Sequence, residues 1–569
     1  MSVVLSEHLP LLASAPDGIQ KLRGLILELA VRGKLVPQDP NDEPASELLK
    51  RIANERTRLE AEGTCRKSKP TPAVSNDEQP FTLPEGWVWI RLGQIGDWGA
   101  GATPLRSNPR YYGGSIPWFK SGELTSDLIS DAEEHVTELA LKECSLRQNR
   151  TGDVLIAMYG ATIGKTAILA KPATTNQAVC ACTPNTGVFN RYLLTLLKAL
   201  KPNFIGQGAG GAQPNISREK IVATVAALPP EAEQHRIVAK VDELMALCDR
   251  LEAEQADAAG AHARLVDTLL GTLTQSADAA DLAANWQRLA EHFDTLFTTE
   301  ASIDALKQTV LQLAVMGKLV PQNPNDEPAS KLLKRIGQER ARLEAGGTCK
   351  KSKSMPPVGE DEQPFEVPES WVWERIGNYA VQTDYGLSEK TLSMTEGVPV
   401  LKMGDIQAGK VILGGQKVVA LATEGLPYLF LEPGDLLYNR TNSAELVGKT
   451  GIFRGLAQQY SFASYLIRIR CFNELVSPTF LNFVMNSPMF RETEIVPHLK
   501  QQCGQANVNG TILRNMRIPV PPAAEQHRIV AKVEELMALC DLLKADLVEA
   551  RASQASLADT LIEAALEVA

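Results

Sequence analysis

The chain has 569 residues, of which 44% are hydrophobic and 22% charged, and its formal net charge at pH 7 is −10. No apolar run approaches the roughly 20 residues of a membrane-spanning helix, and the first residues lack the pattern of a signal peptide. We therefore expect a cytoplasmic protein of several domains, without a membrane, whose nine cysteines are reduced thiols, because they contain no CxxC pair.

The acidity is unevenly distributed along the chain. Residues 85–228 carry 14 Lys and Arg against 11 Asp and Glu, a net +3, and residues 369–520 carry 14 against 13, a net +1. The remainder carries 30 against 44, a net −14. Two nearly neutral regions thus lie within an acidic frame, which leaves room for local basic faces toward nucleic-acid phosphates.

The chain begins with a helical segment. Apolar residues at helical spacing predict a helix from Ile19 to Ala30 that stops before Gly33. A turn at 37–44 precedes a second, charged helix over Ala45–Glu62. Residues 63–82 are a polar connector with prolines, and LPEGWVWIRLG at 83–93 predicts the strand that opens the first nearly neutral region.

These elements occur twice. LAVRGKLVPQDPNDEP from Leu29 returns, almost unchanged, from Leu313, and LPEGWVWIRLG returns as VPESWVWERIG at 367–377. PPEAEQHRIVAKVDELMALCD at Pro229–Asp249 returns at Pro521–Asp541. A period this long excludes a solenoid and indicates a tandem duplication with a pseudo-two-fold axis.

The repeat predicts six segments. They are an N-terminal helical frame with its connector at 1–84, a first domain at 85–228, a central long helix and linker at 229–300, a second helical frame and connector at 301–368, a second domain at 369–520 and a C-terminal long helix at 521–569.

The two domains are where the copies diverge. Both are rich in short β-type runs bounded by Gly and Pro, with helical stretches such as Tyr192–Leu200 and Pro478–Asn486. Residues 151–169 align with 433–453 if the second copy has a two-residue insertion. The predicted fold class is α+β, with two mixed α/β domains on a repeated helical frame.

Each long helix has apolar residues at alternating spacings of four and three, as in a coiled coil. An antiparallel pair of such helices would separate the two domains, although packing of each helix on its own domain is an alternative. The predicted seams are Ile237, Val241, Leu244, Cys248, Leu251, Gln255, Ala258, His262, Leu265 and Leu269 in the first copy, and Ile529, Val533, Leu536, Cys540, Leu543, Leu547, Ala550, Gln554, Leu557, Leu561 and Ala564 in the second.

Motifs for catalysis are weak. Gly164-Lys165-Thr166 and Gly448-Lys449-Thr450 resemble the end of a phosphate-binding loop, but the motif also requires a glycine five positions before the glycine of each GK pair, and these positions hold Tyr159 and Ser443. The Gly-rich run at 206–215 does not follow a strand and open a helix, as a dinucleotide site requires. We expect a non-catalytic chain with no cofactor and no metal.

Several motifs resemble the specificity subunit of type I restriction–modification systems, in the variety with an extended repeated helical frame. They are GATP and YYGGSIPWFKSGEL within 101–124, YGATIGKTAI at 159–168, GAQPNIS at 211–217, VPVLKMGDIQ at 398–407, LYNRTNSAELVGKT at 437–450, QANVNG at 505–510 and both copies of PPxxEQHRIVAKVxEL.

The resemblance implies two target recognition domains, each reading one half of a split double-stranded DNA sequence. It also implies two methyltransferase subunits that methylate adenine N6, and two restriction subunits that supply ATP-driven translocation and cleavage. A coiled-coil scaffold that binds only proteins and, less favoured, a stand-alone DNA methyltransferase or nuclease are the alternatives.

For DNA contacts we favour polar and cationic residues in Gly-punctuated loops, because Arg suits guanine and Asn or Gln suits adenine. Lys165 and Lys449 are candidates for phosphate contact, and the tryptophans are expected in the core. The predicted residues are Lys120, Ser121, Tyr159, Lys165, Asn176, Gln177, Gln213 and Asn215 in the first domain, and Lys402, Asp405, Asn439, Arg440, Asn442, Ser443, Lys449, Gln505 and Asn507 in the second.

Overall fold

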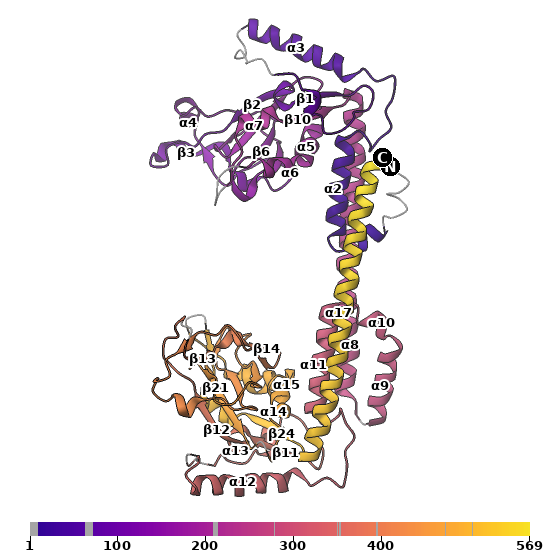
Figure 1. Ribbon diagram of the computed structural model, residues 1–569. Helices are drawn as coiled ribbons and strands as arrows, with labels where there is room; N and C mark the ends of the chain where they lie inside the picture. The colour runs from indigo at the N-terminus through magenta and orange to yellow at the C-terminus, as the bar shows by residue number, and fades with distance from the viewer. Residues whose placement is uncertain are drawn as a thin grey trace. The chain divides into compact units, whose positions relative to one another are not determined.

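The chain forms two compact units, Met1–Ala258 with Ala550–Ala569, and Ala259–Glu549. The structure is a computed structural model, shown in Figure 1. It describes residues 10–62, 72–208, 214–277, 279–349, 351, 354–393, 396–472, 474–502 and 505–568. The division does not follow the sequence repeat, because each unit contains the far end of a long helix that begins in the other one.

The first unit combines a helical bundle with the first domain. Its helices are α2 (Gly18–Val31), α3 (Ala45–Ala61), α4 (Glu138–Glu143), α5 (Asn190–Ala199), α6 (Lys201–Gly206), α7 (Arg218–Ala223), the first part of α8 (Glu231–Gln275) and the end of α17 (Ala523–Val568). The second unit contains the remainder of α8 and α17 together with α9 (Ala279–Glu291), α10 (Phe293–Leu296), α11 (Glu300–Val315), α12 (Ala329–Ala345), α13 (Ile376–Tyr379), α14 (Pro478–Met485), α15 (Pro488–Phe490) and α16 (Gly510–Asn515).

In the first unit, α2 runs antiparallel to α8 and parallel to the end of α17. Arg23 on α2 pairs with Asp249 of α8 at 2.6 Å, whereas the earlier Ala13 accepts a hydrogen bond from the later Gln255. On α17, Lys21 pairs with Asp559, and the later Lys34 donates to the carbonyl of the later Leu566. Within this unit α8 and α17 are therefore antiparallel.

The second unit repeats this bundle with α11 in place of α2. Lys34 donates to the carbonyl of Leu566 at 2.8 Å, and its repeat copy Lys318 donates to that of Thr274 at 2.9 Å. The two acceptors are themselves repeat copies, near the ends of α17 and α8. Each bundle is thus completed by the long helix of the other repeat.

The buried face of each long helix departs from the predicted seam. Leu265 and Leu557 are 51% and 47% exposed, whereas the next residues, Val266 and Ala558, are 3% and 0% exposed. A helix advances about 100° per residue, so 29 residues bring Val266 within about 20° of the face of Ile237. The predicted seam positions Leu265 and Leu557 were therefore wrong, because each helix keeps the 3.6-residue period of a helix packed in a bundle, whereas the seam residues Leu269 and Leu561 are half-buried against the cores.

The first domain contains a five-stranded sheet in the order β2-β9-β6-β7-β4 and a three-stranded sheet in the order β5-β3-β8. Its strands are β1 (Val88–Arg91), β2 (Gly96–Ala100), β3 (Tyr112–Phe119), β4 (Leu128–Ile129), β5 (His135–Val136), β6 (Val154–Ala157), β7 (Thr166–Leu169), β8 (Thr174–Thr175), β9 (Val179–Pro184) and β10 (Val225–Leu228), which pairs with β1.

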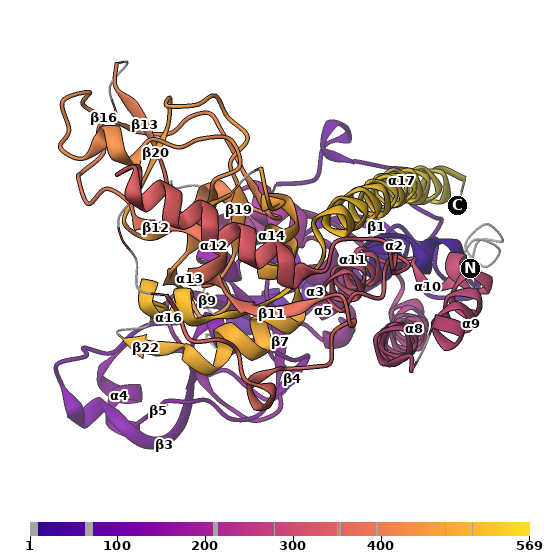
Figure 2. The ribbon, with the colours of Figure 1, turned by 90° about the horizontal axis from the view of Figure 1, so that it is seen from below.

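The second domain has sheets in the orders β12-β21-β17-β19-β15-β14, β16-β13-β20 and β18-β23-β22. Figure 2 shows α12 lying along this domain beside α13. Its strands are β11 (Val372–Arg375), β12 (Ala380–Tyr385), β13 (Val398–Leu401), β14 (Ile406–Gln407), β15 (Lys410–Val411), β16 (Val418–Val419), β17 (Leu436–Asn439), β18 (Thr441–Asn442), β19 (Thr450–Ile452), β20 (Ser461–Phe462), β21 (Leu466–Cys471), β22 (Lys500–Gln502), β23 (Gln505–Asn507) and β24 (Arg517–Val520), which pairs with β11.

The repeated EQHR sequence joins each domain to its long helix. Glu233, 1% exposed, accepts a hydrogen bond from the indole nitrogen of Trp87 at 3.0 Å, and Glu525 accepts one from Trp371 at the same distance. The next residue in each copy, a buried glutamine, accepts from a backbone N–H that precedes α5 or α14. The repeated letters therefore encode a joint, and these tryptophans are buried as predicted.

No helix in the described ranges is long and apolar enough to cross a membrane.

Candidate nucleic-acid interface

Four loops meet at one edge of the first domain. The backbone N–H of Asn176 donates to the carbonyl of Phe119, which precedes Lys120. Met158 donates to the carbonyl of Ala178, and the following Tyr159 forms a β-bridge with Asn215. These bonds bring together the loops at 119–121, 158–160, 175–178 and 214–216, which carry most of the residues predicted in this domain.

The second domain has the same edge. Ala463 donates to the carbonyl of Leu401, which precedes Lys402, and Arg440 donates to the carbonyl of Tyr465. Thr441 pairs with Asn507, as Tyr159 pairs with Asn215. These bonds make Lys402 the structural counterpart of Lys120, and Asn507 that of Asn215.

The predicted two-residue insertion also appears in the hydrogen bonds. Ala157 donates to the carbonyl of Lys165, eight positions later, whereas its counterpart Asn439 donates to that of Lys449, ten positions later. Both lysines thus directly precede the strand that returns from this edge, β7 or β19. Neither makes an ion pair or a side-chain hydrogen bond with the residues that the structure describes.

A glycine is required where each edge is most crowded. A Cβ on Gly101 would lie 2.1 Å from the carbonyl oxygen of Thr175, and one on Gly386 would lie 2.2 Å from that of Phe462. These distances are far below any normal contact, so another residue at either position would push the loops apart. This explains the glycine of the GATP motif.

The predicted residues of the first domain differ in availability. Tyr159 is 42% exposed, and Gln177 and Asn215 are exposed. Asn176 is half-buried and accepts from the backbone N–H of Ala178, which fixes its loop. Lys120, Ser121 and Lys165 are half-buried, and Gln213 lies outside the described residues.

In the second domain, Lys402, Ser443 and Lys449 are exposed. Asn439 is only 2% exposed and donates to the carbonyl of Leu446, so it lies in the loop's interior. The Asp405 carboxylate accepts from the backbone N–H of Lys402 at 2.6 Å.

The other residues predicted there lie on β17–β18 and β23. Asn442 accepts from the backbone N–H of Ser443, and Asn507 accepts from the hydroxyl of Thr441. Gln505 lies on β23, and its side chain is outside the described residues.

Arg440 is the most distinctive group of the second edge. Its guanidinium lies 4.9 Å from the ring centroid of Tyr385 and donates to the carbonyl of Ser464 at 3.2 Å. Tyr385 and Tyr465, beside it, are 46% and 50% exposed. The counterpart of Arg440 in the first domain is Met158, which is 3% exposed.

Sequence reasoning missed an ionic cluster beside Lys120. The Glu134 carboxylate lies 2.5 Å from both the Lys120 ammonium and the Arg106 guanidinium. Hydrogen bonds from Arg106 and then Lys120 hold the pKa of Glu134 below its usual value. Arg106 lies between the GATP and YYGGSIPWFKSGEL motifs, and nothing in the sequence indicates its pairing with a residue 28 positions away.

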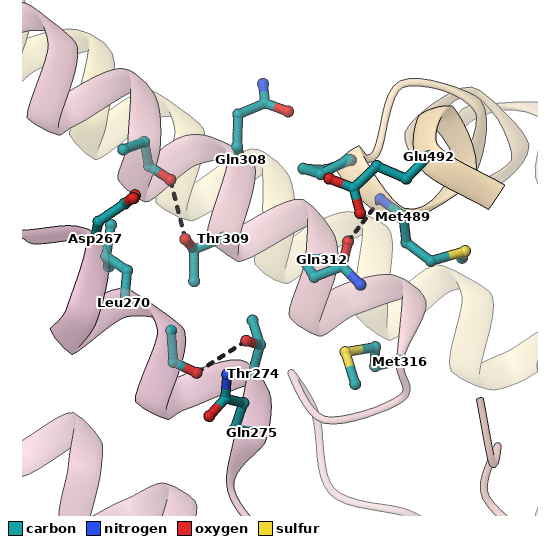
Figure 3. A pocket seen from close by; sticks show the side chains of 13 residues that line it. Asp267, Leu270, Thr274, Gln275, Gln308, Thr309, Gln312, Met316, Met489 and Glu492 are labelled. Carbon is teal, nitrogen blue, oxygen red and sulfur yellow. Dashed lines mark hydrogen bonds between the residues drawn. The ribbon is translucent and has the colours of Figure 1, made fainter. Parts of the chain in front are cut away.

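A cavity of about 580 Å³ lies in the second unit between the end of α8, α11 and the α15 region (Figure 3). Its lining mixes polar and apolar groups, and Gln312 accepts from the backbone N–H of Met489 across it. None of the residues predicted to contact DNA lines this cavity. Within the described ranges, no three or more His, Cys, Asp or Glu side chains form a group that could hold a metal ion.

Comparisons with known proteins agree with this architecture. The family model of the type I restriction modification DNA specificity domain matches residues 84–259 and 376–550. The specificity subunit of the Escherichia coli type I restriction enzyme EcoEI is 37% identical over 96% of this chain and 94% of its own length.

That of the E. coli enzyme EcoAI is 38% identical over the same shares. One chain, from a structure described as the basis of complex assembly and conformational transition of the type I R-M system, has a TM-score of 0.49 at 18% identity, covering 86% of this chain and 99% of that one. On the strength of the two family-model matches and the two full-length relatives, this protein is a member of the type I restriction–modification specificity subunits.

Proposed function

We propose that each domain reads one half of a bipartite double-stranded DNA target through the loop edge described above. The observation that carries this proposal is that the two edges share their backbone hydrogen bonds but not their exposed side chains. A common backbone presents side chains in the same way in both domains. Different side chains on it would select different bases.

The chemistry of the edges suits base recognition. Arg440 carries the planar fork of donors that matches guanine O6 and N7, and Gln177 and Asn215 are exposed amides of the kind that pair with adenine. Lys165 and Lys449 would contact phosphates, which position a protein on the duplex without reading sequence. The remaining predicted residues would support the loops or contact DNA beside these groups.

The catalytic steps would belong to partner subunits. We propose a cytoplasmic complex with two methyltransferase subunits, which methylate adenine N6, and two restriction subunits, which use ATP. In this arrangement the chain itself binds no cofactor and contributes recognition. Its acidic helical frame and the nearly neutral domains suit a division between protein-docking and DNA-contacting parts.

Exchange of residues 85–228 for the same segment of a relative tests the proposal. The exchanged chain would be assembled with its methyltransferase subunits, and the methylated motif would be read by methylation-sensitive sequencing of the host genome. We expect one half of the motif to change while the other half and the spacer length stay the same. A change of both halves together would contradict independent reading by the two domains.

A further inference from the structure

The ionic cluster of the first domain consists of Arg106, Lys120 and Glu134. Glu134, whose side chain is 32% exposed, bridges the two cations. The Arg106 guanidinium also lies 4.9 Å from the ring centroids of both Tyr112 and Trp118. One carboxylate and two aromatic rings therefore fix a guanidinium whose side chain is still 54% exposed.

This cluster is continuous with the loop edge. The backbone N–H of Ala102 donates to the carbonyl of Thr175, and the hydroxyl of the next residue, Thr103, donates to the side chain of Gln177. Arg106 follows three residues after Thr103. Lys120 directly follows Phe119, whose carbonyl accepts from the backbone N–H of Asn176. Arg106 thus lies beside the residues predicted to contact DNA, although it was not among them.

The second domain has the opposite charge at the same place. Trp118 donates to the carbonyl of Glu134, and its counterpart Val400 donates to that of Lys417, so Lys417 occupies the position of Glu134. Lys417 is exposed and makes no ion pair within the described ranges. The duplication therefore kept the backbone and reversed the charge.

The counterpart of Arg106 also differs. Gly101 and Gly386 are equivalent, and five residues after each come Arg106 and Thr391. The Thr391 hydroxyl accepts from the ammonium of Lys402 at 2.9 Å. At the same sequence distance from the equivalent glycines, one domain thus has an exposed, carboxylate-bound guanidinium and the other a neutral hydroxyl.

Glu134 changes what the two cations can bind. A phosphate that approached Lys120 or Arg106 would meet a carboxylate at the same site, so indiscriminate contact with the DNA backbone is disfavoured. A guanidinium has five N–H donors, so contact with Glu134 leaves donors free for a base edge. Among bases in the major groove, guanine offers the two acceptors, O6 and N7, that fit an arginine.

We propose that Arg106 is a specificity-determining residue that contacts a guanine of the first half-site. Glu134 is its positioning residue, and it also keeps Arg106 and Lys120 from binding phosphates of any sequence. The inference rests on the proposed function of the first domain. It adds a residue, a base and a means of discrimination to that function.

The test uses the complex of the full-length chain with its methyltransferase subunits. Wild type first gives the methylated motif, which checks the proposed function on its own. Arg106→Lys and Arg106→Ala are then compared on duplexes in which each base pair of the first half-site is changed in turn. We expect a loss of discrimination of roughly 5- to 150-fold at one G·C pair, with the second half-site unchanged. Lysine should not rescue it, because a lysine lacks the planar fork.

Glu134→Gln separates positioning from folding. We expect tighter binding to non-cognate duplex and a plot of log affinity against log salt that is steeper by about 0.9 for each phosphate gained. Glu138→Gln is the matched control, since it removes the same charge from an exposed position in the first turn of α4.

Two results would overturn the inference while the wild-type motif stays bipartite. One is unchanged discrimination at every first-half base pair in folded Arg106 variants. The other is a salt slope for Glu134→Gln equal to that of Glu138→Gln.

Discussion

The first and second domains have the same hydrogen-bonded edge but different chemistry on it. The first presents Tyr159 and a guanidinium bound to Glu134, whereas the second presents Arg440 between exposed tyrosines, with Lys417 in place of the carboxylate. Backbone bonds and the crowded glycines persist through divergence because their loss would displace every loop. Exposed side chains carry no such constraint, so they can change with the target.

The joints between each domain and its long helix, formed by the repeated EQHR sequence, are alike in both units, unlike the loop edges. The largest predicted effect concerns these joints. Replacing Trp87 or Trp371 with Ala should lower the free energy of unfolding of the corresponding unit by about 3–5 kcal/mol. Each change also leaves a buried carboxylate, Glu233 or Glu525, without its indole donor.

Hydrogen exchange measured in each unit separately checks this prediction. Trp87→Phe is the control, because it keeps most of the volume and loses only the N–H. If both units lost protection equally in Trp87→Ala, the comparison of two independent joints would be wrong.

The second prediction concerns the crowded glycines. Gly101→Ala and Gly386→Ala each force a methyl group against a carbonyl oxygen, and the backbone shift should cost about 1–3 kcal/mol. Gly101→Ala should weaken discrimination in the first half-site alone, and Gly386→Ala in the second half-site alone. Binding to duplexes altered in one half at a time measures this. Gly122→Ala, where no atom lies within 4 Å of the added Cβ, should leave binding unchanged.

The third prediction asks whether Lys165 and Lys449, which form no ion pair with any residue that the structure describes, are equivalent. Lys165→Ala and Lys449→Ala should each reduce the salt slope of DNA binding by about 0.9, with base preference unchanged. Lys171→Ala is the control, because Lys171 follows the opposite end of β7. Altered base preference in either variant would assign that lysine to reading rather than to phosphate contact.

The smallest effect is a pH dependence. Hydrogen bonds from Arg91, then Ser75, lower the pKa of Glu78 from 4.5 to about 2, and its counterpart Glu362 is lowered chiefly by Arg375. A carboxyl with a lowered pKa in the folded state stabilises the fold above 4.5 and loses this contribution as the pH falls toward 2. The free energy of unfolding, measured with denaturant, should therefore decrease as the pH falls from 4.5 toward 2 in wild type, and decrease less in Glu78→Gln. Equal weakening in both proteins would count against the Arg91 pairing.

Local signals made much of the fold predictable. The expected helices at 19–30 and 192–200 correspond to α2 and α5, which begin and end within two residues of the prediction. Both depend on helical spacing and on end signals close by in sequence. Because the sequence repeats, each element predicted in one copy was also predicted in the other. The predicted two-residue insertion agrees with the hydrogen bonds of Ala157 and Asn439.

The features that escaped prediction depend on packing between distant segments. The buried face at Val266 and Ala558 follows from bundle packing, which a coiled-coil pattern does not describe. The helix α9, in the linker between the repeats, has no repeat copy that could indicate it. Arg106 and Glu134 are each ordinary surface residues in sequence. Glu134 directly precedes β5, which pairs with β3, and Arg106 reaches it by lying over the rings of Tyr112 and Trp118 on β3.

The exchange of helix ends between repeats also sets the order in which the chain can fold during synthesis. Every residue of the second unit, Ala259–Glu549, has been added before the ribosome reaches Ala550. The bundle around α2 still needs the last turns of α17 at that point. At roughly 5–20 residues per second, the last turns of α17 follow α2 by on the order of a minute, so until then the bundle of α2 and α8 lacks its third helix. The unit whose translation starts first is the last to close.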